Sequence, residues 1–282
     1  MFYSINNLSK AVYLTLYPNL TLANSHGISM SCDPDTFVSL GGLEVSFNKK
    51  GTFSNLLYVT HDNLLAGEKI KLVDIFSIIP ELIEIYHMRF QKSPRVFLTQ
   101  KIRDFSYKLF VREDDVLNNN LIDDFKILNK YGLHISIPFD NYYFIYLDAN
   151  YLKKYYDKCF VSDIYGNEYC SLGIEINGQH KIISKITSLY ICYYAFSMLV
   201  RYHPDIWMKI CESADTAIVR KLLSYCRKEM LVEVLQKLNN EEYSFATKLD
   251  SNFVLDSREI YEMVKDEMKR EKKAYNISKG IW

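Results

Sequence analysis

The chain has 282 residues, of which 49% are hydrophobic and 24% are charged, which is the composition of a globular protein and not of a disordered one. Chains of this length form one large domain or two small ones. The 34 basic and 34 acidic side chains give a formal charge of zero, which argues against a general polyanion binder, so a nucleic-acid role would require a local basic patch.

The beginning of the chain predicts one helix followed by a polar loop. Hydrophobic side chains recur at helical spacing across residues 3–17, and Pro18 closes this segment. The polar stretch over 19–35 contains His26 and Gly27, and the glycine suits a turn that requires a positive φ angle.

Residues 43–60 predict a β-hairpin. Polar and apolar residues alternate across 43–47, residues 48–51 have turn chemistry, and residues 53–60 are mostly apolar. These short runs begin a β-rich part of the chain.

A helix and further strands are expected next. Asp74 is a good N-cap for a helix over residues 75–90, in which Pro80 marks a kink or a late start. Residues 95–111 contain two extended runs, and residues 118–130 indicate a short amphipathic helix.

The last part of the β-rich region leads into helices. Residues 133–147 are rich in strand-forming residues, and the turn residues Gly166–Asn167 and Asn177–Gly178 indicate another hairpin region. From Ser184 onward the pattern is helical.

Four helices are expected in this final part. The first spans about 184–200, and Pro204 can occupy the first turn of the second, where Asp205 favours the positive helix end. A long amphipathic helix covers 217–238, and Asp256 begins the last helix.

This order of elements predicts an α+β fold. Helical N- and C-terminal parts are expected to pack together around a β-rich middle region. The three parts are residues 1–35, an N-terminal helix and loop, residues 36–182, the mixed β-rich region, and residues 183–282, the C-terminal helices. The first and third parts are expected to form one compact unit.

Residues 189–200 are the most informative stretch, because they are apolar or aromatic with one exception. At a rise of ~1.5 Å per residue, a helix of this length cannot cross a hydrocarbon layer of ~30 Å. We therefore expect a central helix that packs against the N-terminal helix and the 217–238 helix. Tyr193, Phe196 and Leu199 should be nearly fully buried.

The cysteines and the chain start bear on the cellular compartment. The six cysteines form no Cys-x-x-Cys pair, which favours buried reduced thiols over disulfides or a zinc site. The first residues lack the basic and apolar regions of a signal peptide. These patterns predict a cytoplasmic protein without a membrane partner, a metal or a cofactor.

The best local cluster for chemistry is Arg201-Tyr-His203-Pro-Asp205. Arg201 ends the buried helix, where the helix dipole stabilises a cation, and His203 can titrate near neutral pH. Such a cluster can bind phosphate or assist RNA cleavage. It can also neutralise and cap a helix junction, with Asp205 or another carboxylate pairing Arg201. His26 is likewise either a pocket residue or a loop residue, and these four are the candidate binding residues.

Other polar and aromatic groups have simpler interpretations. The aspartates at 114–115 and 123–124 lack the alternating ligands of a calcium loop, so solvated acidic turns are expected. The mixed charges of residues 265–273 indicate a solvated helical face. Three tyrosines of the β-rich region can stack a nucleotide base or pack in the core: Tyr142, Tyr143 and Tyr146.

Residues 3–11, 25–28 and 199–207 together resemble the bacterial YaaC-like protein family. The helix pair around Arg201 is similar to proteins of the HEPN type, many of which are RNases or companions of anti-phage defence systems. HEPN RNases carry an arginine and a histidine at a wider spacing than Arg201 and His203, which one residue separates. The resemblance therefore implies a scaffold or sensor and carries over no nuclease site.

We expect a non-catalytic association or sensor component of a bacterial cytoplasmic system, in anti-phage defence, that acts as a homo-oligomer or with a protein partner. One alternative is a metal-independent RNase with Arg201 and His203 as catalytic residues. Another is a nucleotide-sensing module, so a nucleic acid or nucleotide is a further candidate partner. We also expect the His26 loop to approach the Arg201–Asp205 corner, and Trp207 to pack in the core.

Overall fold

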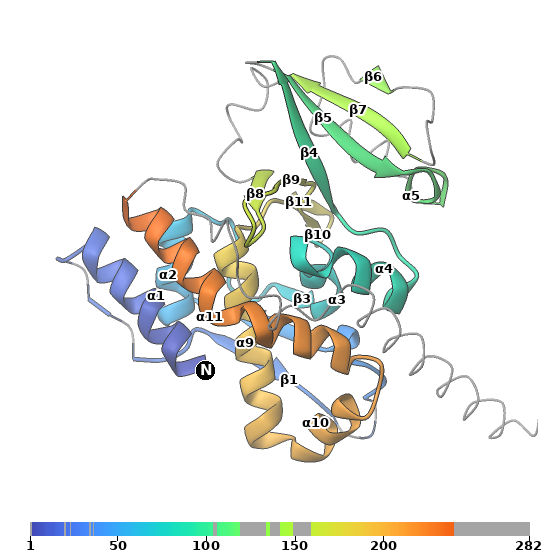
Figure 1. Ribbon diagram of the computed structural model, residues 1–282. Helices are drawn as coiled ribbons and strands as arrows, with labels where there is room; N and C mark the ends of the chain where they lie inside the picture. The colour runs from blue at the N-terminus through green and yellow to red at the C-terminus, as the bar shows by residue number, and fades with distance from the viewer. Residues whose placement is uncertain are drawn as a thin grey trace, which may run out of the picture.

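The computed structural model describes residues 2–19, 21–22, 24–33, 35, 37–103, 106–118, 134–135, 142–148 and 159–239. These residues have the expected α+β fold, in which helices pack beside antiparallel sheets (Figure 1). The helices are α1 (Phe2–Leu16), α2 (Thr52–Thr60), α3 (Leu72–Phe76), α4 (Ile83–Phe90), α5 (Glu113–Asn118), α9 (Lys185–Tyr202), α10 (Pro204–Cys211) and α11 (Thr216–Asn239), with the 3-10 helices η1 (Leu40–Gly42) and η2 (Pro80–Leu82).

The strands form three antiparallel sheets. One has the order β1-β2-β3, the second is the hairpin β10-β11, and the third has the order β6-β7-β5-β4-β9-β8. The bounds are β1 (Ile28–Ser31), β2 (Glu44–Phe47), β3 (Lys69–Lys71), β4 (Val96–Arg103), β5 (Ser106–Arg112), β6 (His134–Ile135), β7 (Tyr142–Asp148), β8 (Phe160–Ser162), β9 (Glu168–Ser171), β10 (Ile174–Ile176) and β11 (Gln179–Lys181).

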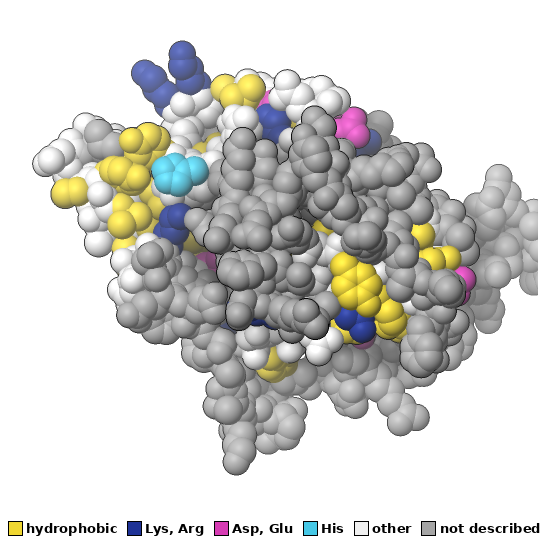
Figure 2. Space-filling view, turned by 90° about the horizontal axis from the view of Figure 1, so that it is seen from above, with side chains coloured by type: hydrophobic (Ala, Val, Ile, Leu, Met, Phe, Trp, Pro, Cys, Tyr) yellow, Lys and Arg dark blue, Asp and Glu magenta, His cyan; other side chains and the backbone are white. Residues whose placement is uncertain are grey.

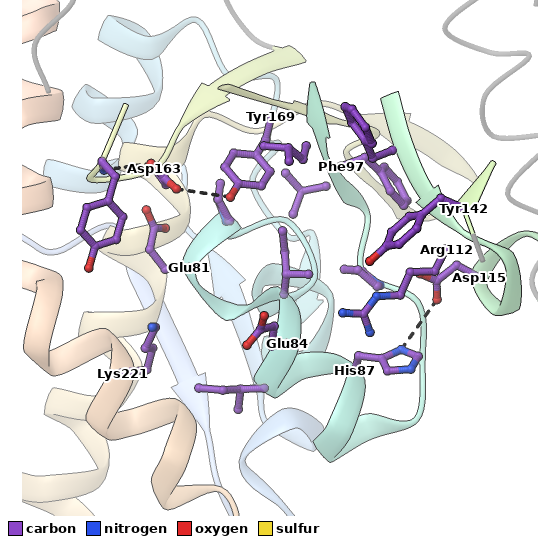
Figure 3. A pocket seen from close by; sticks show the side chains of 18 of the residues that line it. Glu81, Glu84, His87, Phe97, Arg112, Asp115, Tyr142, Asp163, Tyr169 and Lys221 are labelled. Carbon is purple, nitrogen blue, oxygen red and sulfur yellow. Dashed lines mark hydrogen bonds and ion pairs between the residues drawn. The ribbon is translucent and has the colours of Figure 1, made fainter. Parts of the chain in front are cut away.

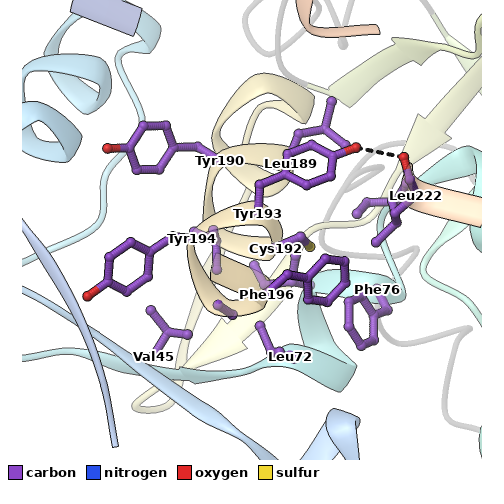
Figure 4. Packing of buried hydrophobic residues seen from close by; sticks show 14 of the residues in the cluster. Val45, Leu72, Phe76, Leu189, Tyr190, Cys192, Tyr193, Tyr194, Phe196 and Leu222 are labelled. Atoms are coloured by element: carbon purple, nitrogen blue, oxygen red, sulfur yellow. Dashed lines mark hydrogen bonds between the residues drawn. The ribbon is translucent and has the colours of Figure 1, made fainter. Parts of the chain in front are cut away.

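The largest hydrophobic cluster surrounds α9, as its sequence predicts. Ser184 caps this helix, because its side chain accepts a hydrogen bond from the backbone N–H of Thr187. Tyr193, Phe196 and Leu199 are only 2%, 4% and 0% exposed. Both α1 and α11 pack against α9, so the expected central helix is confirmed (Figure 4).

Two tyrosine hydroxyls of α9 form hydrogen bonds to the neighbouring helices α1 and α11. Tyr190 donates a hydrogen bond to Oδ1 of Asn6 in α1, over 2.9 Å. Tyr193 donates to the backbone carbonyl of Leu222 in α11, also over 2.9 Å (Figure 4). Each bond gives a buried polar atom a partner. The tyrosine rings pack in the apolar core, while their hydroxyls hold the two flanking helices in position.

Residues 52–60 form helix α2, so the predicted hairpin over 43–60 is wrong. Strand β2 pairs with β1 and β3 instead. Phe53, Leu56 and Thr60 are buried at helical intervals. A short apolar run of this length fits a strand or a helix equally well, which explains the error.

The helix predicted over 75–90 starts late, at Pro80, which is one of the two outcomes expected for this proline, and it ends at Phe90 as expected. Its predicted N-cap is wrong. Helix α3 begins at Leu72 with Lys71 as its N-cap, so Asp74 lies in the first turn and is not the cap. Pro80 begins η2, where its missing N–H would have had no helical partner. Helix α4 then follows directly after η2.

Most other predicted elements are present in the described residues. The two extended runs within 95–111 are β4 and β5, and the two expected turns close the β8–β9 and β10–β11 hairpins. Pro204 begins α10 as expected, and α11 matches the predicted long helix. The helix predicted beyond residue 118, the aspartates at 123–124, the helix from Asp256 and the charged residues 265–273 lie outside the described residues.

A smaller hydrophobic cluster lies on one face of β5 and β7. Leu109, Val111 and Ile145 are fully buried there, and Tyr143 packs against them. Because side chains alternate along a strand, Tyr142 and Tyr146 lie on the opposite face from Tyr143. The three tyrosines therefore do not form one stacking surface.

Three side chains differ in burial from their expectations. Trp207 is only partly buried and lies 6.1 Å from the ring of Phe196 at the edge of the core, because α10 turns away after Pro204. Asp115 is 3% exposed, so it is not in a solvated turn. Cys211 is exposed, whereas Cys159, Cys170 and Cys192 are buried free thiols as expected.

Within the described ranges, each helix is too short or too polar to span a lipid bilayer. The same residues contain no cluster of three or more potential metal ligands from His, Cys, Asp and Glu. The search for a site therefore turns to pockets and charged side chains.

Candidate functional site

Two glycines hold the His26 loop against the start of α2. Gly27 has a φ angle of +76° and Gly51 one of +148°, values that favour glycine. A Cβ added to Gly51 would lie 2.1 Å from the backbone nitrogen of Gly27, so the two backbones touch. The carbonyls of Ser25 and His26 accept hydrogen bonds from the first two N–H groups of α2, over 2.8 and 2.9 Å. The position of His26 is therefore fixed by its backbone.

The imidazole of His26 lies between α1 and α9. Its ring centroid is 5.2 Å from that of Phe2 and 6.1 Å from that of Tyr194, and both rings are buried. It opens onto a pocket of about 250 Å³. We call this pocket the His26–Arg201 corner, and its lining residues are Phe2, His26, Tyr194, Ser197, Met198, Arg201 and Tyr202.

Arg201 reaches this corner from the last turn of α9 and is exposed. Its Nη1 donates a hydrogen bond to the hydroxyl of Tyr3 over 2.8 Å. The guanidinium carbon also lies 4.4 Å from the centroid of the Tyr3 ring, which is cation–π geometry. Figure 1 shows the first turns of α1 beside the lower half of α9, where this contact forms. Because Tyr3 is neutral, this contact does not neutralise the positive charge of Arg201.

The electrostatics of the corner favour an anion. Burial lowers the pKa of His26 below its ordinary value of 6.5, and the positive charges of Lys10 and Arg201 lower it further. The imidazole is therefore mostly neutral at pH 7. The hydrogen bond to Tyr3 raises the pKa of Arg201, which stays charged. No carboxylate is among the groups that shift either pKa in the described residues.

The expected approach of the His26 loop to Arg201 is confirmed, although the two residues are far apart in sequence. His203 and Asp205 do not line this pocket. His203 ends α9 and caps α10, and Asp205 is exposed in the first turn of α10. Asp205 was one of several possible partners of Arg201, and the hydrogen bond goes instead to the hydroxyl of Tyr3.

A family model described as YaaC-like Protein matches residues 1–238 of this sequence. The chain belongs to the YaaC-like family. The match includes α1, the His26 loop and the whole of α9, which together build the corner. No curated protein and no solved structure matches the chain.

Sequence reasoning missed two residues that act on this YaaC-like corner without lining it: Tyr3, which bonds to Arg201, and Lys10, whose charge acts on His26. Both belong to α1, and they are seven residues apart, which is two helical turns and therefore one face of the helix. That spacing could have identified them, because Tyr3 is exposed on a helix whose buried residues occupy the other face.

Two groups considered from the sequence lie elsewhere in this YaaC-like protein. Tyr142 and Asp115 line a second, larger pocket beside α4. Asp115 accepts a 2.5 Å hydrogen bond from the hydroxyl of Ser93 and lies 3.7 Å from Nδ1 of His87. The second pocket is therefore built separately from the His26–Arg201 corner.

Proposed function

We propose that this YaaC-like protein is a non-catalytic recognition component of a bacterial cytoplasmic system, a sensor or an association partner. Its His26–Arg201 corner binds a phosphate-bearing partner. The observation that carries this proposal is the meeting of the exposed Arg201 guanidinium with the His26 imidazole in one open pocket. Burial lowers the pKa of His26, the charges of Lys10 and Arg201 lower it further, and no carboxylate of the described residues is among these causes.

The elements around the corner support an anionic partner. Residues 2–16, 24–31, 48–60 and 185–202 contain no aspartate or glutamate, although the whole chain has 34 acidic residues. The cations whose charges act on His26 are Lys10 and Arg201. This is the local basic patch that a neutral chain requires for a polyanion. By contrast, the described side chains in Figure 2 show basic and acidic groups scattered over the face seen from above.

The aromatic rings favour a nucleic acid or nucleotide over a simple anion. Tyr3 is 52% exposed and Tyr202 is 62% exposed, and both lie beside Arg201. Exposed rings next to cations are the usual elements of single-strand binding, because bases stack on the rings while phosphates meet the cations. Similarity to the HEPN type suggests anti-phage defence as the setting for such recognition.

Binding can be tested with a fluorescent single-stranded RNA and the complete chain. Anisotropy should rise with the wild-type protein, and Arg201→Gln should weaken binding about tenfold and lower the salt dependence by about one phosphate contact. Lys237→Gln is the matched control, because Lys237 is an exposed cation in the last turn of α11 and does not line the corner. Equal weakening by both variants would reject the corner as the site.

A metal-independent RNase is the second candidate, and one observation favours it. The lowered pKa of His26 leaves an imidazole free to accept a proton beside Arg201, which could stabilise a phosphate. Incubating the same RNA with wild-type, His26→Ala and His203→Ala proteins tests both imidazoles. Cleavage lost only in His26→Ala would assign it the role expected of His203. Intact RNA in every sample, with binding retained, would leave recognition as the function.

A homo-oligomer or a protein partner is also part of this proposal. Figure 2 shows hydrophobic side chains gathered at one edge of the visible face. Leu14, Leu16 and Tyr58 are exposed on α1 and α2, which pack together. Light scattering coupled to size-exclusion chromatography would measure the mass, and a monomer at all concentrations would argue against self-association.

A further inference from the structure

A second pocket lies away from the corner and has a volume of about 440 Å³. It lies between the ends of β5 and β7, helix α4, the β8–β9 turn and α11 (Figure 3). Small-molecule sites in proteins have volumes of about 300–1,000 Å³. The pocket is therefore large enough for a ligand of nucleotide or amino-acid size.

The wall of this pocket is mainly apolar and aromatic. Pro80 and Val96 are buried at its base, with Phe97 beside them. Phe110 and Tyr142 contribute rings from the sheet, and Tyr142 is 39% exposed. Such a wall can bury a flat aromatic ligand, with rings stacked against rings.

Most of the carboxylates in the pocket already have partners within the protein. Glu81 accepts a hydrogen bond from the Lys185 ammonium over 2.8 Å. Asp163 accepts one from the Tyr169 hydroxyl over 3.3 Å (Figure 3). Asp115 accepts the hydrogen bond from Ser93 described above. These carboxylates are structural, because each one orders a neighbouring segment.

Two charged residues of the described pocket lining, Arg112 and Glu84, lack such partners. Within the part of the chain that the structure describes, neither side chain makes a hydrogen bond or an ion pair, and they do not pair with each other. In Figure 3 the guanidinium of Arg112 points into the pocket toward Glu84 and His87. Two opposite charges therefore face one partly enclosed space without neutralising each other.

The strand register explains where Arg112 points. It is the last residue of β5 and is paired with Tyr142 of β7, so the two side chains lie on the same face of the sheet. Val111 faces the small hydrophobic cluster, which turns Arg112 and Phe110 to the pocket side. A cation thus stands directly beside two aromatic rings.

We propose that this pocket binds a small aromatic ligand that carries both an anionic group and an N–H-rich or ammonium group. Arg112 holds the anionic group, since its planar donors match a carboxylate or phosphate. Glu84 accepts hydrogen bonds from the N–H-rich group, and the ring lies against Tyr142 and Phe110. This second site is independent of the function proposed for the His26–Arg201 corner.

The presence of Glu84 distinguishes this pocket from the corner. A carboxylate facing the same space repels a ligand that is only anionic. A ligand with both groups satisfies both side chains at once. Two sources share this chemistry: a nucleoside monophosphate with an amine on its base, and an aromatic amino acid.

Calorimetric titration of the complete chain separates these sources. The four nucleoside monophosphates and the three aromatic amino acids are titrated singly, and one of the two groups is expected to bind. Arg112→Gln should weaken that ligand at least about tenfold, the usual effect of losing a charged hydrogen bond. Lys101→Gln is the matched control, because Lys101 is exposed on β4 and does not line the pocket.

Glu84→Gln tests the second contact through matched ligand pairs. Adenosine and inosine monophosphates differ in one amine, as do phenylalanine and 3-phenylpropionate. The wild-type protein should prefer the member with the amine, and Glu84→Gln should lose most of this preference. Arg201→Gln serves as the background for these titrations, because it weakens the corner. The binding lost when Arg112→Gln is added to that background belongs to this pocket. No heat from either group of ligands, or equal weakening by Lys101→Gln, would overturn the proposal.

Discussion

Gly51→Ala should destabilise the protein far more than a glycine replacement at an ordinary turn. Gly51 has a φ of +148° and a ψ of 176°, a conformation almost restricted to glycine. Strain there costs about 1–3 kcal/mol. The new Cβ, 2.1 Å from the backbone of Gly27, would also separate the two segments and disrupt both hydrogen bonds to the start of α2. At about 1 kcal/mol for each bond, the expected loss is about 3–5 kcal/mol.

Urea denaturation followed by circular dichroism measures this loss as a change in the free energy of unfolding. Gly178→Ala is the matched control, because Gly178 has a φ of +72° but no atom within 4 Å of the added Cβ. Strain alone should cost about 1–2 kcal/mol there. If Gly51→Ala cost no more than Gly178→Ala, the close backbone contact that positions His26 would be refuted.

Three further substitutions test other contacts. Asp215→Ala leaves the guanidinium of Arg89 without its carboxylate, 2.8 Å away, and should cost about 3–5 kcal/mol in urea denaturation. Tyr190→Phe removes the buried hydrogen bond to the asparagine of α1 and should cost about 1–2 kcal/mol by the same method. Arg201→Gln removes a cation that lowers the pKa of His26, so an NMR titration should show that pKa rising toward 6.5; no change would contradict the proximity of the two side chains.

The helices of the C-terminal half could be predicted because their signals are long and local. Helix α9 has an apolar stretch too short for a membrane, and Pro204 marks the next helix start. Residues 53–60 carry no such long signal. Eight apolar-rich residues after a turn fit a strand as well as a helix, so the pattern did not decide between them. The helical start of this segment is decided by the approach of Gly51 to Gly27, a contact between distant segments that no local pattern contains.

The corner was predictable in part. His26 and Arg201 were expected together because each stands at the end of a packed helix or its following loop. The partner of Arg201 was not, because the choice between Tyr3 and Asp205 depends on how α10 leaves α9. Asp205 was one candidate partner, but the turn at Pro204 places it in the exposed first turn of α10.

The larger pocket was missed except for Tyr142 and Asp115. Its residues come from many separate elements, and the two charges proposed to hold a ligand, Glu84 and Arg112, are far apart in sequence. Arg112 stands at a polar position of an alternating strand, where an arginine normally faces solvent. Only the structure distinguishes Arg112 from such a solvent-facing arginine, because it shows the side chain inside a pocket and without a partner.

The bond between Tyr190 and Asn6 has a consequence for how the protein is made. The two residues are 184 positions apart, and Leu40 likewise bonds to Asp215 over 175 positions. At about 5–20 residues per second, a ribosome needs roughly 10–40 s to synthesise the intervening chain. During that time α1 can pack against α2, but it has no α9 or α11 to cover the rest of its apolar face. The side chains that later contact α9 and α11 stay exposed, which makes the nascent chain a substrate for chaperones until α11 emerges.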